Sequence, residues 1–322
     1  MDLEVLILHY YLKVFSIILT LFLILCFFNI YFLLNKNIEI KNNVISIKKG
    51  DTLTVVLNDN INNFSQYDIF LVIHFYKLKN YLFKEFIHFG KFYIDDDILL
   101  LDFLNIIFKP SNIVNKLTII EGWSTYELNR ELSKHFDKIF DIPYEEIIAD
   151  TYYYTNDKSF LQFVENLKKT KFDYFNKFKD NKIFENFSQR QLMIIGSLIE
   201  KEGYNYNDKK LISSVIKNRL IRKMRLQIDA TVLYALTDGK YNLERKLFLK
   251  DLKINHPYNT YKIDGLPPKP ISYVGKKTLD ILLENHESDF MFYFFNNSLK
   301  RHIFSENYKN HIKKLNEYRN TK

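Results

Sequence analysis

The chain has 322 residues, with 46 Lys and Arg against 38 Asp and Glu, and its formal net charge is +8. This length allows one large domain or two smaller ones with hydrophobic cores. The positive charge favours anionic partners such as lipid head groups or an acidic cell-wall polymer. No arginine-rich block or nucleic-acid motif is present, so nucleic acid is not expected as a partner. The one cysteine, Cys26, excludes an intrachain disulfide and a thiol-ligated metal site.

The first predicted element is an apolar run of 21 residues from Val14 to Leu34, which defines a transmembrane anchor within residues 1–37. At about 1.5 Å per residue, such a helix crosses a hydrocarbon core of about 30 Å. No small-residue cleavage site follows it, which favours a retained anchor over a removed signal peptide. The flanking charges taken alone place the rest of the chain in the cytoplasm, but large domains cross membranes regardless of charge. The orientation is therefore left open.

Residues 38–116 alternate short strand patterns with helical ones, which predicts a small α+β subdomain. Pro110 and its neighbours separate this segment from the next. The expected strands are 44–47 and 90–94, and the expected helices are 52–58, 67–82 and 98–108.

From residue 117 to 322 the pattern is mainly helical and predicts one larger domain. A polar turn at 296–300 between two apolar segments predicts a C-terminal hairpin. The fold class is therefore α+β: a single N-terminal transmembrane helix, a small α+β subdomain and a larger, mainly helical domain. The expected strands are 117–120, 152–154, 289–295 and 301–304, and the expected helices are 125–136, 160–179, 189–202, 208–223 and 305–320.

Glu202 is the most informative residue of the larger domain. It lies at the C-terminal end of a predicted helix that Ser188 caps, three residues after Ile199 and four after Leu198, on the same apolar face. Glu200 points to nearly the opposite side of that helix. Burial and the negative end of the helix dipole both hold a proton on Glu202 near neutral pH, as a general acid requires. The alternative is a helix-terminal carboxylate that turns out to solvent.

Arg219 falls in the middle of the apolar face of the next helix, where an unpaired guanidinium would be costly. It therefore needs either a carboxylate, for which Asp229 and Glu200 are candidates, or several backbone carbonyls. A third possibility is an arginine whose stem packs on the core while its head reaches solvent.

Other kinds of chemistry find little support in the sequence. The histidines lack metal-ligand spacing, and the chain has no Gly-rich phosphate loop, nucleophile elbow or dinucleotide fingerprint. We therefore expect neither a cofactor nor a metal. Acid–base chemistry on a carboxyl group is left as the main enzymatic candidate.

Several segments together resemble the MltG (YceG-like) family of membrane-anchored endolytic murein transglycosylases. Their order and spacing fit this family over residues 117–316, and the anchor also fits. The small subdomain at 38–116 resembles the family's LysM-like subdomain. The matching segments are Ile120–Trp123, Asp150–Tyr152, Ser197–Glu202, Asn218–Leu220, Met224–Thr231, Asn259–Tyr261, Gly265–Ile271 and His302–Ser305.

The resemblance implies an enzyme that cuts the MurNAc–GlcNAc bond of nascent peptidoglycan strands without water. Glu202 matches the family's essential acid, the second Glu of its Glu-Lys-Glu motif. The product would carry a 1,6-anhydro-MurNAc end, and the enzyme would act as a strand terminator. Its catalytic domain would lie on the periplasmic or extracytoplasmic side of the cell (inner) membrane, with cell-wall synthases as candidate partners.

The resemblance also implies a groove that holds sugar hydroxyls and N-acetyl groups, with Arg219 organising it. The implied substrate-binding residues are Asn218, Arg219, Gln227, Asp229, Thr231, Asn259, Thr260, Tyr261 and His302.

The chain departs from the family pattern at three positions. Gly203 replaces the usual Thr after the Glu-Lys-Glu motif, Ala230 replaces a Pro, and Val274 replaces the Pro before Gly275. None of these changes removes the expected acid.

Two alternatives to the enzyme stay open at this point. One is a catalytically inactive, membrane-anchored peptidoglycan-binding scaffold on the same fold, against which the presence of Glu202 argues. The other is a basic membrane protein that binds nucleic acid or anionic lipid on the cytoplasmic side, which only the flanking charges support.

Overall fold

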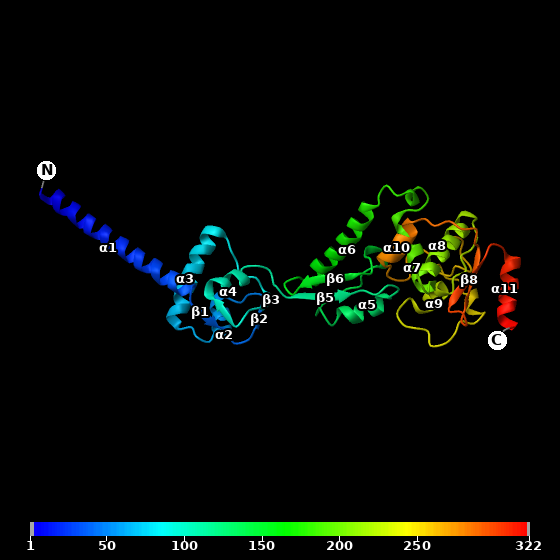
Figure 1. Cartoon of the computed structure of the whole chain (residues 1–322), viewed down its shortest axis with the longest axis horizontal. Helices are drawn as coiled ribbons and strands as arrows, with labels where there is room; N and C mark the ends of the chain where they lie inside the picture. Colours follow the sequence, from blue (N-terminus) through cyan, green and yellow to red (C-terminus); the bar gives the residue numbers. More distant parts are fainter. Residues whose placement is uncertain (1–2, 321–322) are drawn as a thin grey trace. The chain divides into compact units, whose positions relative to one another are not determined.

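The structure is a computed structural model that describes residues 3–320, and these form two compact units (Figure 1). The smaller unit contains the chain up to Asn115 together with Tyr153–Lys158, and the larger contains Lys116–Tyr152 and the chain from Ser159 onward. The chain passes between the units within strand β5 (Val114–Thr118), within strand β6 (Thr151–Thr155) and again between Lys158 and Ser159. Strands β5 and β6 pair with each other. The mixed α+β class is confirmed: the described chain is mostly helical with small sheets.

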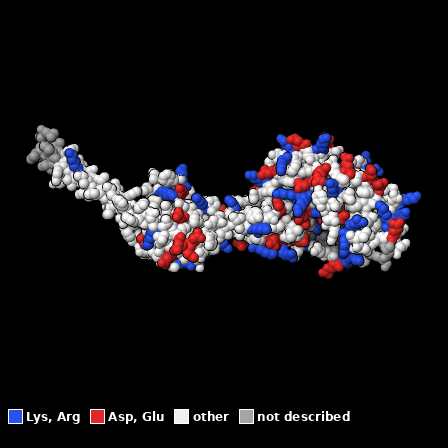
Figure 2. Space-filling model, in the orientation of Figure 1, with Lys and Arg blue, Asp and Glu red and all other residues white. Residues whose placement is uncertain are grey.

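Helix α1 (Leu3–Leu34) contains the apolar run. Among the described helices it is the one with the length and composition to cross a membrane, over His9–Leu34. In the view of Figure 2 its surface is covered almost wholly by uncharged side chains. Its last turn inserts Leu33 into the core of the smaller unit. An apolar N-terminal helix is thus confirmed, and it suits either an anchor or a signal sequence.

The smaller unit combines two antiparallel strand pairs with three further helices. Its core is built from apolar side chains of every element, including Phe92, Phe103 and Ile107. Strand β1 (Asn37–Glu39) pairs with β4 (Asp97–Leu99), and β2 (Val44–Ile47) pairs with β3 (Gly90–Tyr93). The helices are α2 (Leu53–Asn60), α3 (Gln66–Phe83) and α4 (Leu100–Ile107).

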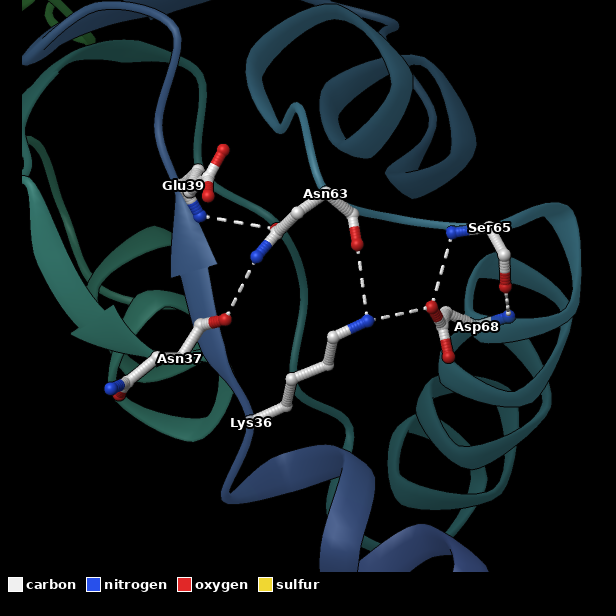
Figure 3. Close-up of polar contacts among 6 residues, drawn as sticks. All are labelled: Lys36, Asn37, Glu39, Asn63, Ser65 and Asp68. Atoms are coloured by element: carbon white, nitrogen blue, oxygen red, sulfur yellow. Dashed lines mark hydrogen bonds and ion pairs between the residues drawn. The ribbon is translucent and has the colours of Figure 1, made fainter.

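A polar network ties the end of α1 to the start of α3 (Figure 3). Lys36 donates to the Asp68 carboxylate at 2.9 Å and to the Asn63 carbonyl at 3.1 Å. Asp68 is also part of the capping box that Ser65 forms at the start of α3. The Asn63 amide in turn bonds the backbone of β1 at Asn37 and Glu39. The junction after α1 is therefore held by ion pairing and hydrogen bonds.

The larger unit is built around α7 (Gln189–Glu202), whose residues Leu192 to Ile199 are all buried. Neighbouring helices α8 (Tyr206–Ile221) and α10 (Lys276–Leu283) pack against it. The expected C-terminal hairpin is confirmed, with β7 (Phe292–Asn296) paired antiparallel to β8 (Arg301–Ser305). The remaining helices are α5 (Thr125–Leu132), α6 (Phe160–Lys177), α9 (Asp229–Thr237) and α11 (Tyr308–Asn320), with 3-10 turns at Tyr144–Glu146, Lys182–Glu185 and Asp251–Lys253.

Serine caps fix the starts of three of these helices. Ser124, Ser159 and Ser188 each form a capping box at the start of α5, α6 and α7. Each box satisfies backbone N–H groups that the first helical turn leaves without intrahelical partners. In α7 the Ser188 box fixes where the helix begins, and the helix ends at Glu202, as the sequence predicts.

Candidate active site

Glu202 occupies the last turn of α7 and faces the start of α9. Its carboxylate is partly buried and accepts a hydrogen bond from the backbone N–H of Ala230. The Tyr293 hydroxyl of β7 donates a long hydrogen bond of 3.5 Å to Glu202 Oε2. The carboxylate is therefore turned into the protein and does not extend freely into solvent.

The surroundings of Glu202 raise the pKa of its carboxyl group to about 7. Burial is the largest cause, because it disfavours the charged form, and the negative charge of Asp229 adds to it. The hydrogen bonds from Ala230 and Tyr293 act in the opposite direction, since they stabilise the carboxylate. A carboxyl group that is about half protonated near neutral pH can both donate and accept a proton.

Asp229 is the first residue of α9 and is exposed. The Tyr261 hydroxyl donates to Asp229 Oδ1 at 2.5 Å. Burial and this bond to a carboxylate both raise the pKa of Tyr261, so its hydroxyl keeps its proton. The Tyr261 hydroxyl thus fixes the position of the Asp229 carboxyl group beside Glu202.

The buried Arg219 takes backbone carbonyls as its partners. Its guanidinium donates to Met291 O at 2.8 Å, to Leu226 O at 2.7 Å and to Arg225 O at 3.3 Å. It also lies over the Phe292 ring, 5.2 Å from the ring centroid. Of the partners that the sequence allows, the carbonyls are realised, and the ion pairs with Asp229 and Glu200 are not. Arg219 thereby joins α8 to the hairpin and to the segment that precedes α9.

Glu200 turns away from Glu202, as the helical spacing predicts, but it does not face solvent. Its side chain is only 2% exposed and forms an ion pair with Lys209 of α8. Its other oxygen accepts the Gly275 N–H at 3.0 Å, and Lys209 also donates to Thr278 Oγ1. Glu200 therefore connects the end of α7 to both α8 and α10.

Gly203, which follows the candidate acid, is required for space. Its backbone is extended, with φ −76°, so it does not use the left-handed conformation for which glycine often ends helices. A Cβ at this position would lie 2.3 Å from Lys209 Cγ and 3.0 Å from the Ile199 carbonyl oxygen. The aliphatic part of the Lys209 side chain thus fills the space that a side chain at position 203 would need.

Most of the other predicted groove residues are buried or half-buried and form hydrogen bonds within the protein. Asn218 donates to the carbonyls of Ser288 and Phe290. Asn259 donates to the carbonyls of Leu252 and Ile254. These bonds fix the segments that approach the site.

Thr231 and Thr260 are fully buried and bond each other at 2.8 Å, which joins α9 to the segment at Tyr261. His302 is buried too, with its Nδ1 3.0 Å from Asp208 Oδ2. Gln227 is different: its side chain is exposed, and its backbone adopts a left-handed conformation with φ 51°.

Two groups beside Glu202 escaped the sequence prediction. Tyr293 lies on the hairpin, far along the chain, and no motif links it to α7. Ala230 has a backbone N–H to donate because it stands where the family usually has proline, which lacks this group. The sequence shows the replacement, but only the structure shows that this N–H binds Glu202.

A pocket of about 370 Å³ lies along α9. Its lining includes Ala230, whose N–H binds Glu202, but not Glu202 itself. A second pocket of about 360 Å³ is also lined by Tyr234 and Gly239, so these two residues separate the two neighbouring pockets. Volumes of this size lie at the lower end of the range for small-ligand sites. The first pocket is lined by Ser124, Glu127, Lys201, Ala230, Leu233, Tyr234, Thr237, Gly239, Tyr241, Asn242, Leu243 and Ile271.

Within the part of the chain that the structure describes, no group of three or more His, Cys, Asp or Glu side chains could hold a metal ion. The carboxyl group of Glu202, with its raised pKa, offers acid–base chemistry at this site.

Comparison with known proteins identifies the family. The sequence pattern of the YceG-like family matches residues 45–317, and the chain belongs to this family. The endolytic murein transglycosylase of Bacillus subtilis (strain 168) is 40% identical over 149 residues, which are 46% of this chain and 39% of that protein. The endolytic murein transglycosylase of Streptococcus pneumoniae serotype 2 (strain D39) is 32% identical over 141 residues, which are 43% of this chain and 25% of that protein.

A solved structure is similar over a longer stretch. The crystal structure of a YceG-like protein of Listeria monocytogenes superposes with a TM-score of 0.53 at 25% identity. The match covers 84% of this chain and 98% of that one. The matched segments of the curated relatives are less than half of their length, whereas the structural match extends over nearly all of the Listeria chain.

Proposed function

We propose that this chain is a membrane-anchored endolytic transglycosylase that cuts peptidoglycan at the MurNAc–GlcNAc bond and terminates nascent strands. The observation that carries the proposal is the carboxyl group of Glu202, whose pKa of about 7 suits an acid that must also serve as a base. The family and its relatives named endolytic murein transglycosylases support the choice of substrate.

The reaction needs only one carboxyl group. Glu202 gives its proton to the glycosidic oxygen, and the bond between that oxygen and C1 of MurNAc breaks. The same carboxylate then takes the proton of the C6 hydroxyl of that MurNAc, whose oxygen bonds to C1. The products are a free GlcNAc hydroxyl and a 1,6-anhydro end, with no water consumed. A hydrolase would need a second carboxylate as nucleophile or as the base for water.

The residues around Glu202 divide into two roles in this proposal. Gln227, Asp229 and Tyr261 are the candidates for contact with the sugars, because all three have accessible surface. Asp229 and Tyr261 also interact electrostatically with Glu202. The remaining predicted residues hold the segments that present them: Arg219, Thr231, Asn259, Thr260 and His302 are buried, and Asn218 is half-buried. The two adjoining pockets along α9 supply room for sugar rings on one side of the acid.

We also propose where the enzyme is located. Helix α1 serves as a retained anchor in the cell (inner) membrane, and the larger unit lies on the periplasmic or extracytoplasmic side, where the polymer is. The smaller unit is the LysM-like subdomain, and cell-wall synthases are candidate partners.

Fragment release and binding, measured side by side, distinguish the enzyme from a peptidoglycan-binding scaffold. Incubation of purified peptidoglycan with the full-length protein in detergent should release soluble fragments. Glu202→Gln keeps the shape of the side chain but not its acid–base function, so release should fall by about 10²–10⁴-fold. Sedimentation with insoluble peptidoglycan should still detect binding of the variant. A wild-type protein that binds without releasing fragments would support the scaffold.

A further inference from the structure

Helix α3 of the smaller unit is apolar on two faces. Ile69 and Val72 face inward and are buried in the core. Tyr67, Phe70 and Leu78 lie at helical spacing on the outer side and are all exposed. A helix that exposes a second group of apolar side chains besides its core-facing one normally has a second apolar neighbour, either protein or lipid.

The exposed apolar side chains continue past the end of α3. Tyr81 is 84% exposed and Phe83 is 67% exposed, and Leu82 between them is exposed as well. Phe86 and Phe89 follow in the loop after the helix. Single exposed apolar residues are ordinary on proteins, but a contiguous group marks a surface that contacts something else. The chain is rich in aromatic residues, which accounts for how many of them are exposed. It does not account for their clustering on α3 and the loop after it.

The position of α3 indicates what covers it. Helix α3 contacts α1, and Leu33 of α1 shares a core with Ile69 and Val72. The ion pair of Lys36 with Asp68 fixes the start of α3 at the end of the apolar helix (Figure 3). Figure 1 shows α3 crossing the C-terminal end of α1 and not continuing its line. A helix so placed lies near the plane where α1 would leave a bilayer.

The chemistry of the exposed surface fits a lipid interface. Tyr side chains are enriched where hydrocarbon meets head groups. Phe and Leu are typical of the apolar face of helices that lie at this boundary. Lys77 and Lys84 are exposed among them and would face lipid phosphates. An amphipathic helix in this environment buries its apolar side chains at the boundary between head groups and acyl chains.

We propose that the outer face of α3 and the loop to Phe89 lie in the surface of the bilayer that α1 spans. This inference rests on α1 being a membrane anchor. The contact would hold the smaller unit against the membrane, so that α1 and α3 together form a two-part attachment. The occupant is a phospholipid surface and not a second protein.

Tryptophan fluorescence can test this contact in the full-length chain. The protein is reconstituted into phosphatidylcholine–phosphatidylglycerol vesicles whose acyl chains carry bromine, which quenches nearby indoles. Three variants each add one tryptophan: Tyr81→Trp on α3, Phe22→Trp within the apolar helix, and Tyr93→Trp on β3. The native Trp123 supplies the background that is subtracted. Tyr93 is exposed, and Figure 1 shows β3 on the side of the smaller unit away from α1.

We expect quenching at positions 22 and 81 but not at 93. Quenching at 22 without quenching at 81 would overturn the inference while leaving the anchor in place. A blue-shifted but unquenched tryptophan at 81 would show that protein, such as a second copy, covers α3, which also overturns it. Absence of quenching at 22 would remove the anchor and the inference together. None of these outcomes depends on catalysis, so the proposed enzymatic function is tested separately.

Discussion

At the scale of single residues, the site is organised by opposing influences on one proton. Burial and Asp229 favour the protonated form of Glu202, while the Ala230 N–H and Tyr293 favour the carboxylate. The balance places the pKa at about 7, so the acid form is present below neutral pH and is lost above it. The rate should therefore fall as the pH rises through about 7, which gives the pH–rate profile a descending limb on its alkaline side. Substitutions beside Glu202 should move this limb to higher or lower pH in directions that follow from the contacts.

Asp229→Asn and Ala230→Pro should shift that limb in opposite directions. Removal of the Asp229 charge lowers the pKa of Glu202 and moves the limb to lower pH. Proline lacks the N–H that stabilises the carboxylate, so Ala230→Pro raises the pKa and moves the limb to higher pH. Each shift should be roughly one pH unit. The measurement is kcat/KM against pH on glycan strands.

Two matched variants control for general disturbance. Asp264→Asn removes an exposed carboxylate that pairs with Arg225, and Ala230→Ser keeps the backbone N–H. Neither should move the limb. Shifts of the same sign for Asp229→Asn and Ala230→Pro would show that a group other than Glu202 controls the rate.

The helical spacing alone assigned Glu202 and Glu200 to different faces and placed Arg219 on a buried one. The partners of these groups could not be predicted in the same way. Tyr293 is 91 residues beyond Glu202, and the carbonyls that bind Arg219 belong to three separate residues. Such contacts depend on how distant segments pack, and local sequence patterns do not record them.

At the scale of elements, the strongly patterned helices were predicted within a few residues of their ends. Helices α9 and α10 were not predicted. Both are short and begin without a side-chain cap, at Ile228 and at Gly275, so the usual start signal is missing. Strand β1 has only three residues, too few for alternation to be visible. Tertiary packing, and not local propensity, defines these elements.

The close approach of α7 and α8 at Gly203 gives a prediction about stability. Gly203→Thr restores the residue usual in the family, yet here its side chain would displace Lys209 and break the ion pair with Glu200. Separation of a buried ion pair costs about 3 kcal/mol. Thermal unfolding of the full-length protein, followed by calorimetry, should show this loss in the transition of the larger unit.

A double-mutant cycle identifies the cause of that loss. If Gly203→Thr acts through Lys209, its cost should be much smaller when it is added to Lys209→Ala. Equal costs in the two backgrounds would mean that the crowding is with the backbone at Ile199 and that Lys209 is not involved.

At the scale of the whole molecule, the proposal requires the larger unit and the polymer to be on the same side of the membrane. One of the lysines after the span, Lys36, is ion-paired with Asp68, which weakens its effect as a free flanking charge. A reporter fused to the C-terminus, active only outside the cytoplasm, should therefore be active. A matched fusion active only in the cytoplasm should be silent. The reverse pattern would separate the chain from its proposed substrate.

The central claim is that Glu202 alone serves as acid and then as base, so that no water enters the reaction. Mass spectrometry of the fragments released from peptidoglycan tests this most directly. We predict new ends that are one water lighter than hydrolytic ends, formed by the wild-type protein and absent with Glu202→Gln. Reducing ends with the mass of added water would contradict the account, because they would require a second catalytic group that activates water.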